Sequence, residues 1–158
     1  MSRRFVLVMS LAALAMAQKY DGPRPPKADL LYIKHASDLV PTEDVIAKEQ
    51  DKRSSEITYV IAGAASSVST PLAAPIFLVQ AVKMIPEKLE LFKLDVKNGH
   101  REVRVSSKRT NTAAHLDATR YAADTLWKIE VEDSLEPGEY ALSQADDASN
   151  RAFCFRVR

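Results

Sequence analysis

The segment 88–108 constrains the fold most strongly, because it alternates in polarity on both sides of an Asn-Gly pair. Asn98 and Gly99 are the preferred residues of a two-residue type I′ turn, in which both residues need a positive φ. Two adjacent apolar residues, Leu91 and Phe92, break the alternation and predict a β-bulge near the start of the first strand. In the hairpin register, one face gathers six side chains, five of them apolar: Phe92, Leu94, Val96, Arg101, Val103 and Val105.

Several other segments have the composition and alternation of short strands. They are rich in β-branched and aromatic residues, and clusters of proline, glycine and serine separate them. The clearest are 29–36, 57–63, 76–82, 125–132 and 151–158. Together with the hairpin, a strand within 43–56 and an edge segment around Val68, they predict eight to nine short strands and no long helix. This pattern favours an all-β fold, an antiparallel β-sandwich.

Three connecting segments complete this prediction. Residues 38–43 are expected to form a turn. Residues 43–56 suit either a solvated helix or a strand that enters a hairpin, and the strand is favoured because a β-branched segment follows directly. Residues 64–75 contain serines and two prolines, so they predict a long connection with an edge segment around Val68.

Residues 1–17 have the features of a secretory signal peptide. Arg3 and Arg4 precede an apolar run that closes on Ala17, with small residues at both recognition positions. The run is shorter than the roughly 20 residues that a membrane helix needs, so no membrane span is expected after signal cleavage. Because Phe5 follows the arginines directly, the ordinary export route is favoured over the twin-arginine route. The predicted location is secreted or periplasmic.

The remaining chain divides into residues 18–28, a predicted flexible Pro-rich tether, and residues 29–158, a single β-sandwich domain. The chain has 22 basic and 21 acidic residues, and the signal peptide holds two of the basic ones. The mature chain therefore has 22 − 2 = 20 basic and 21 acidic residues, a formal charge of −1. This balance provides no basic field for nucleic acid, so no nucleic-acid partner is expected.

Cys154 is the only cysteine, so no internal disulfide can form. An exported chain without disulfides must be stabilised by packing alone. Two roles are open for Cys154: a small buried side chain in the last strand, which is favoured, or a thiol that pairs with another chain.

The stretch LEPGEY, residues 135–140, follows an alternating segment and precedes the last predicted strands. It suits a tyrosine corner, in which a tyrosine hydroxyl bonds back to the backbone a few residues upstream where the chain crosses between sheets. In this interpretation Leu135 packs inward, Pro137 and Gly138 make the turn, and Tyr140 donates the hydrogen bond. The alternative is a Pro-Gly turn followed by a core tyrosine.

The ending LEPGEYALSQ and FCFRV, with the middle stretch ITYVIAGAASSVSTPLAAPIFLVQ, resembles exported bacterial proteins of uncharacterised function that share a predicted immunoglobulin-like domain. The resemblance covers residues 29–158. It implies an immunoglobulin-like sandwich and implies no activity, cofactor, catalytic residue or binding residue.

The residues that catalysis or metal binding would need are sparse. The histidines are His35, His100 and His115, and two His-acid pairs, His100 with Glu102 and His115 with Asp117, could meet around zinc or be ordinary polar surface, which is favoured. No GxSxG elbow is present, and four glycines give no phosphate-binding loop. We therefore expect a protein that is not an enzyme, with no cofactor and no metal site.

The expected function is a non-enzymatic exported binding or assembly module that acts through surface loops, such as 64–75, or through a sheet edge. A carbohydrate-binding accessory domain is the main alternative, and a small metal-binding protein or hydrolase is less favoured. Its partner would be a protein or a glycan that the sequence does not identify, and the oligomeric state is open. The aromatic residues that could stack on a glycan are Tyr20, Tyr32, Tyr59, Tyr121 and Trp127.

Overall fold

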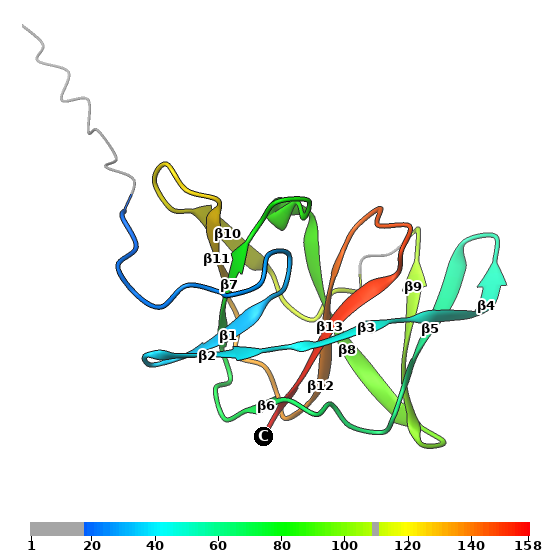
Figure 1. Ribbon diagram of the computed structural model, residues 1–158. Helices are drawn as coiled ribbons and strands as arrows, with labels where there is room; N and C mark the ends of the chain where they lie inside the picture. The colour runs from blue at the N-terminus through cyan, green and yellow to red at the C-terminus, as the bar shows by residue number, and fades with distance from the viewer. Residues whose placement is uncertain (1–17, 109–110) are drawn as a thin grey trace, which may run out of the picture.

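The computed structural model describes residues 18–108 and 111–158, which form an all-β structure (Figure 1). The expected signal peptide lies outside these residues. No helix within them is long and apolar enough to cross a membrane. The first strands are β1 (Tyr32–His35), β2 (Asp38–Pro41), β3 (Glu43–Ile46), β4 (Lys48–Arg53), β5 (Glu56–Ala62), β6 (Ser69–Thr70) and β7 (Ile76–Gln80). A short 3₁₀ turn, η1 (Pro86–Lys88), precedes β8 (Leu89–Lys97), β9 (His100–Ser106), β10 (Leu116–Arg120), β11 (Leu126–Val131), β12 (Gly138–Gln144) and β13 (Arg151–Val157).

Two sheets pack against each other. The smaller has the order β10-β11-β7-β1-β2, and the larger has the order β3-β13-β12-β8-β9-β5-β4 with β6 added beside β13. All pairs are antiparallel except β6 with β13, which is parallel. The antiparallel β architecture predicted from alternation is therefore present.

The main core lies between the two sheets. Its fully buried side chains include Phe77 of the smaller sheet and Phe155 of the larger, whose rings meet edge to face at 5.1 Å. Tyr140 stacks on the other side of Phe155 at 5.7 Å. Each side chain of this size contributes about 2 kcal/mol when it leaves water, so this layer contributes strongly to stability.

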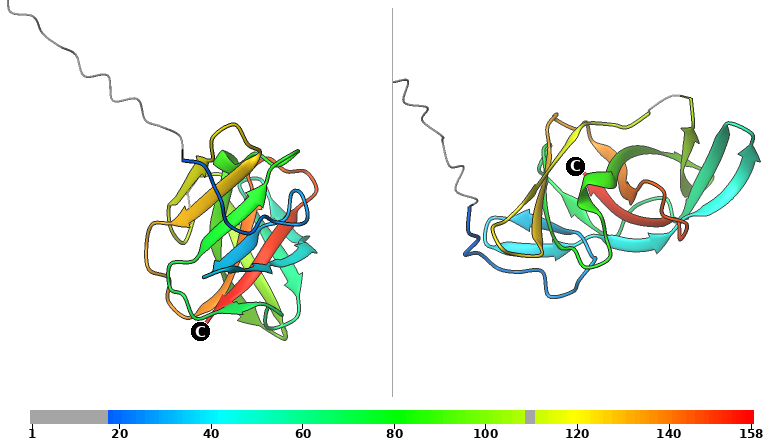
Figure 2. Two further views of the ribbon diagram at one scale, coloured as in Figure 1. Left: turned by 60° about the vertical axis from the view of Figure 1, so that its left-hand side comes forward. Right: turned by 90° about the horizontal axis from the view of Figure 1, so that it is seen from above.

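The larger sheet curls back towards itself, because one chain segment pairs at both of its ends. β3 pairs with β13, and after Ala47 the same run continues as β4 and pairs with β5. The run crosses the molecule in Figure 1, and the view from above in Figure 2 shows the curl. A second, smaller core fills the inside of the curl: Ala47, Ile61, Leu94, Ala141, Ala152 and Cys154.

The expected turn at 38–43 is wrong. The chain reverses earlier, at Ala36 and Ser37, where Ala36 has a φ of 50°. Residues 38–41 then form β2, which pairs with β1 from Tyr32↔Pro41 to His35↔Asp38. Pro41 is tolerated at the end of this short edge strand. Residues 43–56, left open between helix and strand, form β3 and β4 and begin β5, so the favoured strand assignment is confirmed.

The bulge predicted at Leu91 and Phe92 is also wrong. β8 pairs with β12 in one unbroken register from Leu89↔Gln144 to Leu94↔Glu139. Leu91 belongs to the core between the sheets, whereas Phe92 lines a cavity within the curl. Adjacent apolar residues occur here because both faces of the strand are covered. The register shift in the larger sheet lies instead between Glu49 and Lys52 of β4.

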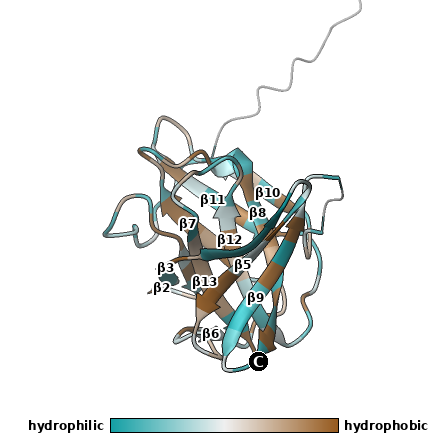
Figure 3. Ribbon diagram, turned by 90° about the vertical axis from the view of Figure 1, so that its right-hand side faces the viewer, coloured by the Kyte–Doolittle hydropathy of each residue, from teal (hydrophilic) through white to brown (hydrophobic). Residues whose placement is uncertain are grey.

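The hairpin turn has the expected geometry. Asn98 and Gly99 have φ values of 50° and 77°, and Lys97 pairs with His100 directly beyond them. Along β9, apolar and polar positions alternate (Figure 3). The predicted apolar face is turned into the curl, although Val96, next to the turn, is 52% exposed.

The hydrogen bond expected of a tyrosine corner is present. The Tyr140 hydroxyl donates to the Glu136 carbonyl oxygen at 2.7 Å, four residues upstream. Leu135 is buried, Pro137 is exposed and Gly138 begins β12. Burial raises the pKa of the Tyr140 hydroxyl, so the group stays a neutral donor.

Residues 18–28 form no helix or strand, but they contact the domain. The Ala122 N–H donates to the Gln18 carbonyl, the Tyr20 ring packs on Tyr121 at 4.9 Å, and Arg24 pairs with Asp124. The segment therefore lies against the β10–β11 connection.

The connection 64–75 is also attached to the domain. Within it β6 pairs with β13, Thr70 is fully buried, and the Ala73 carbonyl accepts a hydrogen bond from the Leu135 N–H. The expected edge segment around Val68 is present one residue later. The exposed residues of the connection are Ala64, Ala65, Ser67 and residues 71–74.

Tyr140→Phe should lower the free energy of unfolding by about 1–2 kcal/mol, because it leaves the Glu136 carbonyl without its donor. Tyr32→Phe is the matched control, since Tyr32 is a buried tyrosine for which the described residues include no hydroxyl hydrogen bond. Urea unfolding of both variants measures the difference. Equal stability of the two variants would show that the corner bond contributes nothing.

Candidate functional site

One end of the curled sheet is closed by a buried ion pair. The Arg101 side chain has no exposed surface. Its Nη1 and Nη2 groups donate to the two carboxylate oxygens of Glu43 at 2.8 and 2.9 Å. Its remaining donors reach the Gly63 and Ala62 carbonyls at 2.9 and 2.7 Å. A bidentate pair with this many partners is held rigidly in place. The Arg101–Glu43 pair is called the floor of the curl below.

Two further groups lie at this closed end. Glu139 is 6% exposed, accepts a hydrogen bond from the Ser66 N–H at 2.9 Å and lies 3.8 Å from Arg156. Cys154, paired across the sheet with Glu43, is fully buried, which matches the favoured role for it. Burial, opposed in part by Arg101, raises the pKa of the Cys154 thiol to about 12. The thiol is therefore not a nucleophile at neutral pH.

The other end of the curl is open, because β8 and β9 separate there. They pair only from Asp95↔Glu102 to Lys97↔His100, next to their turn. Farther from the turn, β8 pairs with β12 and β9 pairs with β5. The gap between the diverging strands leads into the interior of the curl.

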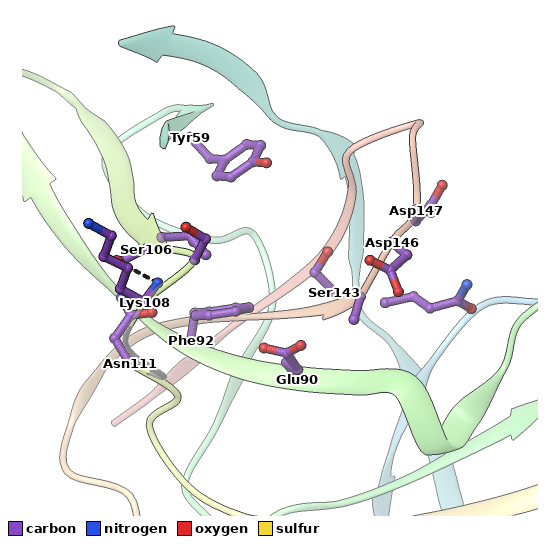
Figure 4. Close-up of a pocket in the computed structure, with 13 residues that line it drawn as sticks. Tyr59, Glu90, Phe92, Ser106, Lys108, Asn111, Ser143, Asp146 and Asp147 are labelled. Atoms are coloured by element: carbon purple, nitrogen blue, oxygen red, sulfur yellow. Dashed lines mark hydrogen bonds between the residues drawn. The ribbon is translucent and has the colours of Figure 1, made fainter. Parts of the chain in front are cut away.

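A pocket of about 550 Å³ occupies this opening (Figure 4). Tyr59 of β5 lies across the pocket from Phe92 of β8. Burial, followed by the nearby Glu49 carboxylate, raises the pKa of the Tyr59 hydroxyl, which therefore stays neutral. The side chains around the mouth are mostly polar: Glu90, Ser106, Ser107, Lys108, Asn111, Ser143, Gln144, Asp146 and Asp147.

A smaller apolar cavity of about 60 Å³ adjoins this pocket, and Tyr59, Phe92, Val105 and Ser143 line both spaces. It exists because one wall of the curl carries small side chains opposite the larger ones of β5, β8 and β9. The side chains of that wall are Ala47, Ala141 and Ala152. The opening therefore runs from a polar mouth to an apolar interior.

Most polar groups at the mouth already have partners. The Ser143 hydroxyl donates to the Arg151 carbonyl at 3.2 Å, and Gln144 Oε1 accepts from the Ile85 N–H at 2.7 Å. Asp147 accepts two bonds from Ser149, which lower its pKa. Glu90 differs, because among residues 18–108 and 111–158 its carboxylate has no hydrogen bond or ion pair.

The histidines singled out for metal binding lie apart from this pocket. His100 bonds to Glu102 at 3.0 Å beside the hairpin turn, at the opposite end of β9. His115 lies 3.9 Å from Glu132, the Asp117 carboxylate accepts a hydrogen bond from the Thr119 hydroxyl, and His35 bonds to Thr70 at 2.9 Å. In the described part of the chain, no three metal-ligating side chains come together.

Of the aromatic residues considered for stacking, Tyr59 is the one that lines the pocket. Tyr32 is buried in the core, Trp127 is half-buried against it, and the Tyr20 and Tyr121 rings pack against each other at a tilt of 42°. The predicted structural residues, Asn98 and Gly99 at the hairpin and Tyr140 at the corner, lie in the framework and not at the opening.

Sequence reasoning missed two residues of this end-to-end arrangement, Glu90 and Arg101. The sequence pattern could have indicated both residues. Arg101 is the charged residue among the six side chains of the apolar hairpin face. Glu90 lies on the same side of β8 as Phe92 and Leu94, two and four residues further along. A charge in phase with an apolar face is a reason to look for a buried pair or a ligand.

The sequence matches no protein-family model, no curated protein and no solved structure.

Glu43→Gln should lower the free energy of unfolding at pH 7 by about 2 kcal/mol, because it leaves the buried Arg101 charge without its anion. Burial opposes ionisation of Glu43, but the Arg101 hydrogen bonds prevail and hold its pKa below the ordinary value. A lowered folded pKa stabilises the protein above the unfolded pKa, and that contribution is lost as pH falls through the folded pKa. The stability gap between wild type and variant should therefore narrow below about pH 4.

Asp133→Asn is the control for this measurement, since Asp133 is exposed and has no ion pair among the described residues. Chemical unfolding between pH 7 and pH 3 measures all three proteins. A gap that stays constant over this range would contradict the stabilising role of the ionised Glu43.

Proposed function

We propose that this chain is a non-enzymatic, exported binding module that holds a small amphipathic ligand in the open end of the curled sheet. The observation that carries the proposal is the union of a polar mouth with an apolar interior cavity. Ligand sites in proteins are typically concave, mainly apolar and furnished with a few orienting polar groups. A ligand with an apolar end and a polar end would fill both parts of the space.

The rigidity of the closed end and of one wall of the cavity supports a binding role. The bonded floor of Arg101 and Glu43 fixes the closed end, and the alanines of β12 and β13 have backbones held in the sheet. A preformed cavity loses little conformational entropy when a ligand enters. The raised pKa of Cys154 and the separation of the histidines from the pocket favour binding over catalysis.

Export and fold family belong to the same proposal. The features of residues 1–17 favour secretion or a periplasmic location, and a fold without disulfides would remain stable there through its core. The Tyr140–Glu136 bond and the packed antiparallel sheets support an immunoglobulin-like sandwich, the fold that the resemblance to exported bacterial proteins implies. The curl of the larger sheet is a departure from the simple two-layer form that this family implies.

The pocket, and not the connection 64–75, is the proposed binding site. Backbone bonds to β13 and to Leu135 hold that connection, so its ordering leaves little free backbone for a partner strand. The connection therefore contributes mainly to the closed end of the curl, where the Ser66 N–H bonds to Glu139.

A carbohydrate-binding module is the second candidate. Tyr59 offers an aromatic face, and the mouth carries the amide and carboxylate groups that bond to sugar hydroxyls. A sugar would leave the apolar cavity empty, whereas an amphipathic ligand would fill it. For this reason the amphipathic ligand is preferred.

The two candidates separate in a calorimetric titration of the processed chain with 1-hexanol and with methyl glucoside. An amphipathic site should bind 1-hexanol with a negative heat-capacity change, the mark of apolar burial. Ala152→Val places two methyl groups in the interior cavity and should weaken binding of 1-hexanol at least about fivefold. Ala73→Val, at an exposed position outside the pocket, is the control.

Binding of methyl glucoside without binding of 1-hexanol would favour the carbohydrate candidate. Equal binding of 1-hexanol by wild type and Ala152→Val, with both proteins folded, would contradict the proposed site. Binding of neither compound would contradict both candidates.

A further inference from the structure

Glu90 is a carboxylate on the inner face of the curled sheet. It alternates in phase with Phe92 and Leu94, which point into the curl, and it pairs across the strands with Ser143. It is half-buried, and no partner for it lies among residues 18–108 and 111–158. In Figure 4 its carboxylate lies beside Phe92 and across the pocket from Tyr59.

Among residues 18–108 and 111–158, the charges around the mouth favour a cation over an anion. Of the described residues that line the pocket, three carry carboxylates, Glu90, Asp146 and Asp147, and one carries an amine, Lys108. Lys108 is exposed at the outer rim. Among nearby bases that do not line the pocket, Lys88 lies 3.9 Å from Asp146 and Lys52 lies 3.9 Å from Glu49.

The walls next to Glu90 favour an organic cation over a metal ion. The aromatic faces of Tyr59 and Phe92 attract ammonium groups through their ring quadrupoles, and apolar surface continues below them. A metal ion prefers several oxygen ligands, and the described residues bring no three metal-ligating side chains together.

We propose that the ligand of this pocket is an amphipathic amine, whose ammonium group pairs with Glu90 and whose apolar part enters the cavity beside Ala141 and Ala152. The inference rests on the proposed function, because it assigns a charge to the ligand of that same site. Glu90 is the counter-ion, and Tyr59 and Phe92 flank the ammonium group.

Three probes with the same six-carbon tail test the assignment: hexylammonium, 1-hexanol and hexanoate, each titrated into the processed chain at pH 7. Hexylammonium should bind about tenfold tighter than 1-hexanol, and hexanoate should bind more weakly than 1-hexanol. Glu90→Gln should bring hexylammonium within about twofold of 1-hexanol. Asp133→Asn, at an exposed carboxylate that does not line the pocket, is the matched control and should keep the preference.

The result with 1-hexanol separates the two levels of the proposal. If 1-hexanol binds but hexylammonium binds no tighter, the charge assignment is overturned and the amphipathic site stands. A preference for hexylammonium that survives in Glu90→Gln overturns Glu90 as the counter-ion. If none of the three probes binds, the proposed function fails together with the charge assignment. Retained 1-hexanol binding by Glu90→Gln shows that the variant pocket is intact.

Discussion

The structure depends on three neighbouring strands, β8, β12 and β13, whose two faces are both covered. One face of each strand packs against the smaller sheet, and the other faces the inside of the curl. On β12 and β13 the side chains of the first face are large, as with Phe153 and Phe155, whereas those of the second face are small, as with Ala152 and Cys154. Large residues hold the sheets together and small residues leave room on the opposite side. A single stretch of chain therefore encodes both a close-packed core and a cavity.

The two ends of that cavity arise from different causes. At one end, charged groups from β3 and β9 meet and bond to each other and to nearby carbonyls. At the other end, β8 and β9 no longer pair with each other. β8 pairs there with β12 and β9 with β5, so the sheet opens between them. This asymmetry places aromatic rings and an inner carboxylate at the open end. The proposed ligand follows from this order of a polar mouth, the aromatic rings of Tyr59 and Phe92, and an apolar interior.

The sequence was sufficient for local structure that depends on neighbouring residues. Asn98 and Gly99 fix the hairpin because only certain residues accept positive φ, and the strand pattern followed from alternation. The two-faced burial of β8 was read as a bulge, since alternation assumes one wet face. The turn at Ala36 was missed because alanine is rarely used at positive φ. The pocket was not predictable, because it depends on where β8 and β9 diverge, and that depends on long-range pairing with β5 and β12.

The single thiol of the chain, on Cys154, offers a way to measure how the larger sheet opens. Cys154 lies behind the Arg101–Glu43 floor on a strand covered on both faces, so a thiol reagent reaches it only when the curl comes apart. The rate of Cys154 labelling therefore measures the opening of that sheet without an engineered cysteine. A bound molecule that stabilises the closed sheet would slow this labelling.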